Sequence, residues 1–296
     1  MAALGAVNIG AQVPVPPSSV QNPSPMVEHS RAHERIEPRD LPGTRRTFEG
    51  PLGKPVEVFV PAGARPGPQH LVIHFHGGAF IPEYAVSQLG SDYVLAVVML
   101  APGSSAYDRA FTEPAVYDTL LANIKRETSA ALNGAATFAD VTLVGYSAGH
   151  GAIRSILRDS SHFAQVNAVL LIDGLHTAYI PDNTVLSRGG KLDESNLTTF
   201  VRFGRAAMAG EKRFLVTHSE IFPGTFASTT ETTDYLVEAL GLKRTPVLRW
   251  GPRGMQQLSE AKQGRFEIQG FAGNAAPDHV DQFQSMPELL KKLVGM

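Results

Sequence analysis

The sequence contains no cysteine, so disulfide bonds, thiolate metal sites and a cysteine nucleophile are excluded, although the cellular compartment is not decided. It also lacks any apolar run approaching the ~20 residues that a membrane-spanning helix requires. The formal net charge of −2 at pH 7 offers no strongly basic surface. These absences argue against a transmembrane segment and against nucleic acid as a partner, and they say nothing about oligomeric state.

The start of the chain has a composition unlike the rest. Residues 11–30 contain five prolines among Ser, Gln and Asn, so we expect residues 1–40 to be a disordered or extended leader. The segment 1–9 has neither the Lys/Arg-rich start nor the long apolar stretch of a signal peptide. The protein is therefore either cytoplasmic or exported with an incomplete or removed signal, and the sequence does not separate these.

The remainder, residues 41–296, has the pattern of a single α/β domain. Continuous apolar runs suit strands that are buried on both faces of a parallel sheet, and four occur: 71–75, 94–100, 141–144 and 166–172. Weaker runs at 214–216 and 266–268, and a pair at 46–49 and 56–60 joined by a turn, complete the set. We predict a mostly parallel central sheet of roughly eight strands flanked by helices.

Helical signals lie between these runs. Val116, Leu120 and Ile124 share one face at a spacing of four, and Ser228 with Glu231 forms a capping box that starts a helix ending at Gly241. The stretch 175–210 is less regular and follows a predicted strand directly. We interpret it as a candidate lid.

The most informative motif is the G-x-S-x-G pentapeptide from Gly145 to Gly149, which directly follows the apolar run 141–144. A serine between two glycines at the end of a buried strand allows a very tight strand-to-helix turn, and this turn exposes the hydroxyl. The helix-compatible stretch 152–157 follows it. Ser147 is therefore the candidate nucleophile, and such a hydroxyl needs a base oriented by a carboxylate.

A second motif, His74 to Phe80, contains His76-Gly77-Gly78-Ala79 at the end of an early buried strand. Together with the G-x-S-x-G motif it resembles the lipase and esterase branch of the α/β-hydrolase superfamily, over about residues 45–290 in element order. The resemblance implies a serine hydrolase acting on small-molecule carboxylic esters, with the α/β-hydrolase fold and no cofactor. It also implies an oxyanion hole formed by the backbone N–H groups of Gly78, Ala79 and Ala148. Ala79 replaces a third glycine that this family often has.

The order of catalytic residues in the family places the base after the nucleophile and beyond the last strand. Among the later histidines, only His279 lies beyond the last predicted strand, in what we expect to be a loop, so it is the candidate base. His74, in contrast, is expected to be a packed strand residue.

Two residues are candidates for the acid that orients this base. Asp173 follows the wholly apolar run 166–172 and precedes glycine, and a carboxylate buried there needs hydrogen-bond donors. Glu220 occupies the commoner family position, after the run 214–216. We favour Asp173 and retain Glu220 as the alternative. Asp278 is adjacent to the candidate base and is less suitable, because its side chain would have to turn back.

Other activities remain open at this stage. The same triad cleaves amides and peptides, and the fold also occurs as a non-catalytic binding module or as a C–C or epoxide hydrolase, although the latter normally has aspartate where this chain has Ser147. His74-x-His76 resembles the start of a dinuclear zinc motif, but the Asp-His pair expected next is absent. With no H-E-x-x-H and no nucleotide-binding glycine motif, we predict no metal and no cofactor.

Overall fold

The structure is a computed structural model that describes residues 34–296. The predicted leader falls mainly on residues outside this range. Its last part, residues 34–40, has no regular secondary structure. Ile36 is nevertheless buried, and its backbone N–H donates to Gln284 Oε1 at 2.7 Å, so this segment is anchored on the globular unit.

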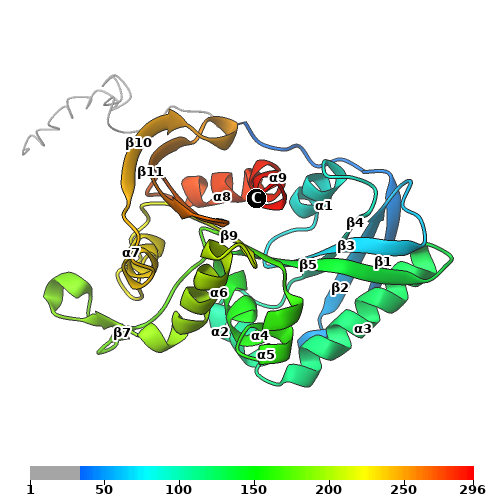
Figure 1. The fold of residues 1–296 in the computed structure, drawn as a ribbon, viewed down its shortest axis with the longest axis horizontal. Coiled ribbons are helices and arrows are strands. Elements are labelled where there is room, and N and C mark those ends of the chain that lie inside the picture. Colours follow the sequence, from blue (N-terminus) through cyan, green and yellow to red (C-terminus); the bar gives the residue numbers. More distant parts are fainter. Residues whose placement is uncertain (1–33) are drawn as a thin grey trace, which may run out of the picture. The chain divides into compact units, whose positions relative to one another are not determined.

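A sheet of ten strands forms the centre of the described unit, in the order β1-β2-β4-β3-β5-β6-β9-β12-β11-β10 (Figure 1). The six central strands run parallel to one another, while β1, β2, β10 and β11 add antiparallel edges. The predicted α/β class and mostly parallel centre are confirmed, with more strands than the roughly eight expected. The strands are β1 (Gly43–Glu49), β2 (Pro55–Pro61), β3 (Gly67–Phe75), β4 (Tyr93–Val98), β5 (Ala136–Tyr146), β6 (Ala168–Ile172), β9 (Arg213–His218), β10 (Thr245–Trp250), β11 (Gln256–Gln263) and β12 (Phe266–Phe271).

The continuous apolar runs are strands because both of their faces are covered. In β6, Val169 and Leu171 belong to one hydrophobic core, whereas Leu170 and Ile172 belong to a second core on the opposite face. The two strands of this sheet that the sequence did not predict are β10 and β11. The strand β10 is exposed along most of its length and includes the exposed apolar Leu248 and Trp250, whereas β11 is mostly polar and at most partly buried along most of its length. Neither strand carries a continuous apolar run of four or more residues, so periodicity did not reveal them.

Helices cover both faces of the sheet, as Figure 1 shows. On one side lie α1 (Phe80–Ser87) and α9 (Met286–Val294), whose apolar residues join the core that contains Ile172. On the other side lie α3 (Pro114–Ala131), α4 (His150–Ile156) and α6 (Thr198–Met208), whose residues join the core that contains Leu171. The remaining helices are α2 (Ser104–Ala110), α5 (Ser160–Gln165), α7 (Thr229–Ala239) and α8 (Ala276–Gln284).

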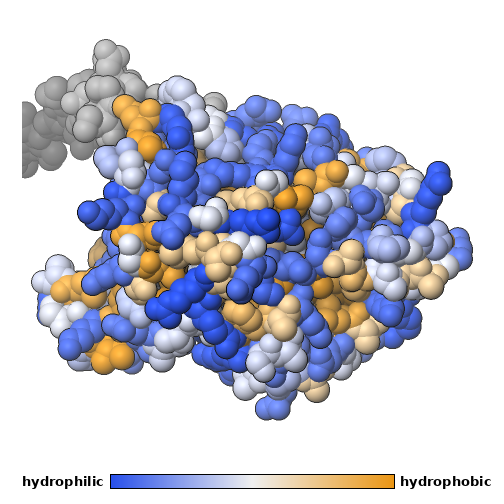
Figure 2. Space-filling view, viewed as in Figure 1, coloured by the Kyte–Doolittle hydropathy of each residue, from blue (hydrophilic) through white to orange (hydrophobic). Residues whose placement is uncertain are grey.

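The predicted candidate lid, 175–210, divides into two parts. Residues 198–208 form α6, which supplies buried Phe200 and Phe203 to the core. The earlier part contains only short 3₁₀ turns and the two-residue strands β7 (Tyr179–Ile180) and β8 (Lys191–Leu192), which pair outside the main sheet. Ile180 and Leu186 are exposed there, and Figure 2 shows apolar side chains at the surface in the region where Figure 1 draws β7.

Within residues 34–296, no helix combines the length and the apolar character needed to cross a bilayer.

Candidate active site

The candidate catalytic residues lie where neighbouring parallel strands end. The sheet register pairs Tyr146 of β5 with Ile172 of β6, and Ile172 with Thr217 of β9. Ser147 and Asp173, the next residues in the chain, therefore lie at the same level, at the carboxyl edge of the sheet. Ligands of open α/β sheets bind at this edge.

Three residues at this edge have a left-handed backbone conformation, which residues other than glycine rarely adopt. The φ angles are 71° at His76, 48° at Ser147 and 41° at Asp173, at the ends of β3, β5 and β6. Such conformations cost on the order of 1–3 kcal/mol each and cluster at functional sites. Ala79, by contrast, has φ −71° and ψ −28°, a conformation open to any residue, so alanine fits where the family often has glycine.

Glycines make the turn at Ser147 tight enough to fit. A Cβ on Gly149 would lie 2.1 Å from the carbonyl oxygen of Phe75, and one on Gly174 would lie 2.5 Å from the carbonyl oxygen of Ser147. A Cβ on Gly145 would approach the backbone nitrogen of His150 to 3.0 Å. The serine turn is therefore packed directly against the ends of β3 and β6.

Asp173 is buried, with 2% of its surface exposed, and it accepts four hydrogen bonds. His279 Nδ1 lies 2.7 Å from Oδ2, and Ser219 donates through both its backbone N–H and its hydroxyl, each at 2.8 Å. Thr229 Oγ1 donates at 2.9 Å. Burial favours the neutral acid, but the hydrogen bonds and charge of His279 and the bonds from Ser219 outweigh it, so the pKa of Asp173 lies below its usual value. The structure therefore brings His279 together with Ser219 and Thr229 around the carboxylate of Asp173.

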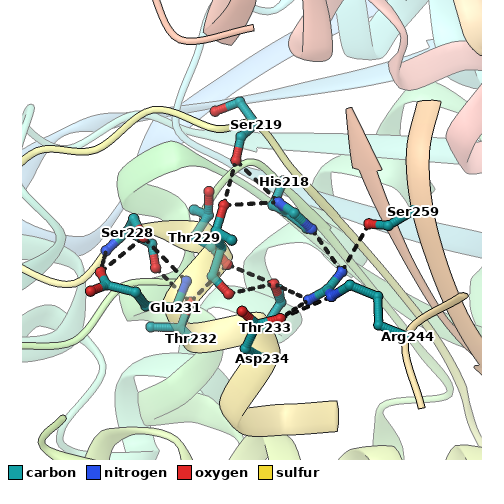
Figure 3. A network of polar contacts seen from close by, with 11 residues as sticks. His218, Ser219, Ser228, Thr229, Glu231, Thr232, Thr233, Asp234, Arg244 and Ser259 are labelled. Carbon is teal, nitrogen blue, oxygen red and sulfur yellow. Dashed lines mark hydrogen bonds and ion pairs between the residues drawn. The ribbon is translucent and has the colours of Figure 1, made fainter. Parts of the chain in front are cut away.

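Ser219 and Thr229, which donate to Asp173, belong to a larger network of polar side chains (Figure 3). His218 donates from Nδ1 to the carbonyl oxygen of Ser219 at 3.1 Å, and its Nε2 accepts from Arg244 at 3.0 Å. Burial and the neighbouring Arg244 guanidinium lower the pKa of His218 to about 4, so its ring is neutral near pH 7. Arg244 also bonds Ser259 and Asp234, which links β9, β11 and α7.

His279 occupies the first turn of α8 rather than the loop that was expected. The difference arises because Pro277 and Asp278 start a helix earlier than the sequence suggested, with Asp278 Oδ2 accepting from the Ala275 N–H at 2.9 Å. This bond occupies Asp278 as a helix cap and leaves it apart from the acid role. The His279 ring stacks on Tyr146 at a centroid distance of 4.7 Å, which limits its orientation.

Ser147, Asp173 and His279 line one cavity of about 270 Å³, together with Phe226 and other residues from 219–229. No hydrogen bond joins Ser147 to His279 within the described part of the chain. In ligand-free enzymes such bonds are often long and tighten when substrate binds.

The oxyanion hole that the sequence indicated stays a prediction. Among residues 34–296, no acceptor is bonded to the backbone N–H of Gly78, Ala79 or Ala148. Ala148 is next to Ser147. The loop of Gly78 is near His279, since the His76 ring lies 6.0 Å from the ring of Tyr146, on which His279 stacks.

Glu220, the alternative acid, is exposed, and its backbone N–H donates to the carbonyl oxygen of Gly273 at 2.9 Å. His279 is bonded to Asp173 instead. The residues that the sequence did not identify are Ser219 and Thr229, because a side chain that donates to a buried carboxylate has no characteristic spacing. The capping box at Ser228, which is confirmed, indicated only that a helix begins beside Thr229.

Across the described residues, no group of three or more His, Cys, Asp or Glu side chains is arranged to hold a metal ion. His74 is buried in the core and stacks on Phe283 at 5.4 Å, as expected for a packed strand residue.

Neither a protein-family model nor a curated protein matches the sequence. Solved structures resemble it distantly. One is a cold-adapted esterase from an Arctic intertidal metagenomic library, with 15% identity over 84% of this chain and 92% of that chain and a TM-score of 0.44. Another is an esterase from Pyrobaculum calidifontis, with 12% identity over 86% and 84% and a TM-score of 0.47. A third is an S-formylglutathione hydrolase from Staphylococcus aureus, with 10% identity over 88% and 99% and a TM-score of 0.45. Similarity at this level carries no conclusion about activity.

Proposed function

We propose that this protein is a serine hydrolase that cleaves carboxylic esters of small molecules through an acyl-enzyme. The observation that carries the proposal is the buried Asp173 bonded to His279 Nδ1 in the cavity that Ser147 lines. A carboxylate on Nδ1 leaves Nε2 as the basic nitrogen of the imidazole, which is the arrangement that a general base needs.

In the proposed reaction, Ser147 Oγ attacks the acyl carbon while His279 Nε2 accepts its proton. The charge that develops on the carbonyl oxygen is stabilised by the N–H groups of Gly78, Ala79 and Ala148, which have no acceptor among the described residues. Asp173 stabilises the imidazolium, and its lowered pKa keeps it ionised at neutral pH. His279 then protonates the leaving alcohol, and water releases the acyl group by the same steps.

Two measurements test this proposal. A fluorophosphonate should label the protein at Ser147, identified by peptide mass, and the Ser147→Ala variant should remain unlabelled. On p-nitrophenyl esters, Ser147→Ala and His279→Ala should each lower kcat by about 10³-fold or more.

Further measurements distinguish ester hydrolysis from amide hydrolysis and from a non-catalytic binding role. Matched p-nitroanilides measure amide cleavage by the same residues, and Glu220→Gln is the control for Asp173→Asn. Absence of labelling together with absence of turnover over a broad ester panel would contradict the proposal and favour a binding role.

A further inference from the structure

A second and larger cavity, about 470 Å³, also opens at Ser147. It shares His176 and Phe226 with the cavity described above and is lined in addition by polar residues that the proposed mechanism does not use. These are Ser104, Ser105, His150, Arg154, Thr177 and Asn196.

Arg154 is the charged side chain of this lining, which contains no carboxylate. Only 8% of Arg154 is exposed, and its Nε donates to Asp108 Oδ1 at 3.0 Å. Its two terminal nitrogens make no hydrogen bond to any described residue. A buried guanidinium normally uses several of its five donors, so these terminal donors are available to a ligand.

The charges around Arg154 do not cancel. Asp108 lies within 3.5 Å of a second cation, Arg158 Nη1, and it also accepts from Ser155 Oγ at 2.7 Å. One carboxylate therefore faces two guanidinium groups. Burial, followed by the neighbouring His176, lowers the pKa of His150 to about 3, and burial also lowers the pKa of His176, so neither ring offsets or adds charge at neutral pH.

The sequence spacing explains why this cation faces the proposed nucleophile. The helix α4 begins at His150, directly after the turn that contains Ser147, and His150 and Arg154 follow at the i, i+4 spacing that places them on one face of α4. His150 Nδ1 donates to the Ser147 carbonyl oxygen at 2.8 Å, which fastens the turn to α4. Side chains of a helix point back towards its N-terminus, which here adjoins Ser147, and Arg154 and Ser147 line the same cavity, so the guanidinium reaches towards Ser147.

We propose that the ester substrate carries a carboxylate, or an anionic group of the same kind, which Arg154 binds in this cavity while the ester carbonyl lies at Ser147. This inference rests on the proposed function and names its substrate class. Arg154 contacts the substrate at a distance from the reacting atoms, so it determines specificity. A monoester of a short dicarboxylic acid has the required chemistry, and the carboxylate could equally be carried by the alcohol part.

The test compares esters that differ in this one charge. On the acyl side, the pair is the p-nitrophenyl monoester of adipic acid and p-nitrophenyl hexanoate. On the alcohol side, it is 4-carboxyphenyl hexanoate and phenyl hexanoate. We expect kcat/KM to favour the anionic ester by at least about tenfold in one arm, and the Arg154→Met variant to lose that preference. Whichever arm shows the preference identifies the part of the substrate that carries the charge.

Arg158→Met is the matched control, because Arg158 contacts the same Asp108 but does not line this cavity. This control should keep the preference. Equal rates on both members of each pair in the wild type, or equal losses in Arg154→Met and Arg158→Met, would overturn the proposal.

A binding measurement separates this inference from the proposed function. The monomethylamide of adipic acid cannot be turned over as an ester, and calorimetry should detect its binding to the wild type and a loss of at least about tenfold in affinity for Arg154→Met. Binding without any ester turnover would support the anion site while contradicting the esterase proposal. No difference between wild type and Arg154→Met would overturn the anion site even if esters are hydrolysed.

Discussion

At the scale of single residues, Asp173 shows how a buried charge is retained. A carboxylate with 2% of its surface exposed would be protonated at neutral pH without partners, but here it accepts from His279, Ser219 and Thr229. Each donor stabilises the ionised form, and together they lower the pKa of Asp173 despite its burial. The orientation of His279 therefore depends on Ser219 and Thr229 as well as on Asp173.

Replacing Thr229 by valine tests this dependence. The variant removes one hydrogen bond to a charged oxygen and keeps the side-chain shape, so the free energy of unfolding at pH 7 should fall by about 1–3 kcal/mol. Since the pKa of Asp173 is lowered in the folded state, the stability that its ionised form contributes is present above its ordinary pKa and is lost as the pH falls through the lowered value.

The penalty of Thr229→Val, as measured by urea unfolding, should therefore shrink as the pH falls below 3.8, the ordinary pKa of the carboxyl group. Thr119→Val is the control, because the Thr119 hydroxyl bonds a helix carbonyl at an exposed position. A penalty that does not change with pH would show that Thr229 does not stabilise the charge of Asp173.

At the scale of elements, the turn between β5 and α4 depends on glycines, because a Cβ at Gly145 or Gly149 would lie too close to neighbouring backbone atoms. The Gly149→Ala variant would force a methyl group to within 2.1 Å of the Phe75 carbonyl oxygen, and this oxygen belongs to backbone that cannot move aside without shifting β3. We expect lower thermal stability than wild type and loss of ester turnover or of fluorophosphonate labelling, because Ser147 would be displaced. Gly295→Ala is the control, since its nearest contact is 3.5 Å away and its backbone is helical. Wild-type labelling of Gly149→Ala would show that the tight turn is not needed.

The same elements show how far sequence reasoning extends. The strands β3, β4, β5 and β6 could be predicted because burial on both faces requires continuous apolar residues, and the helix after Ser228 because capping has a fixed spacing. The strand β11, which lies between β12 and β10, could not, since its side chains are mostly polar and at most partly buried along most of its length. Ser147, Asp173 and His279 could be proposed from chain order, but the donors Ser219 and Thr229 come from tertiary contacts that leave no local pattern.

The largest element without a strong sequence signal is the segment between β6 and α6. We propose that residues 175–197 act as the lid, because His176, Thr177 and Asn196 line the larger cavity. The rest of the predicted lid is mainly α6, which belongs to the core. Thr177 Oγ1 donates to the Asp193 carbonyl oxygen at 2.8 Å, which ties the two ends of this segment together.

At the scale of the whole described unit, we expect buried neutral histidines to make the stability of the fold sensitive to acid. Burial lowers the pKa of His74 to about 3, and both of its ring nitrogens are buried without a hydrogen-bond partner in the described structure. Burial also lowers the pKa of His150 and His218. A histidine whose pKa is lowered on folding contributes stability that is complete above about pH 6.5, and this stability is lost as the pH falls towards the lowered value.

The His74→Leu variant measures one of these contributions. Leucine has no proton to bind, so between pH 6 and pH 4 the free energy of unfolding of the variant should fall less steeply than that of the wild type, by up to about 1.4 kcal/mol per pH unit. Val72→Ala, on the same strand β3 and equally buried, should lower stability by a similar amount at every pH, because it removes packing and no titrating group. Urea unfolding at closely spaced pH values gives both slopes. If the curve of His74→Leu ran parallel to that of the wild type, the imidazole of His74 would have to remain neutral in both states or be charged in both, and acid sensitivity would have to arise from other buried groups.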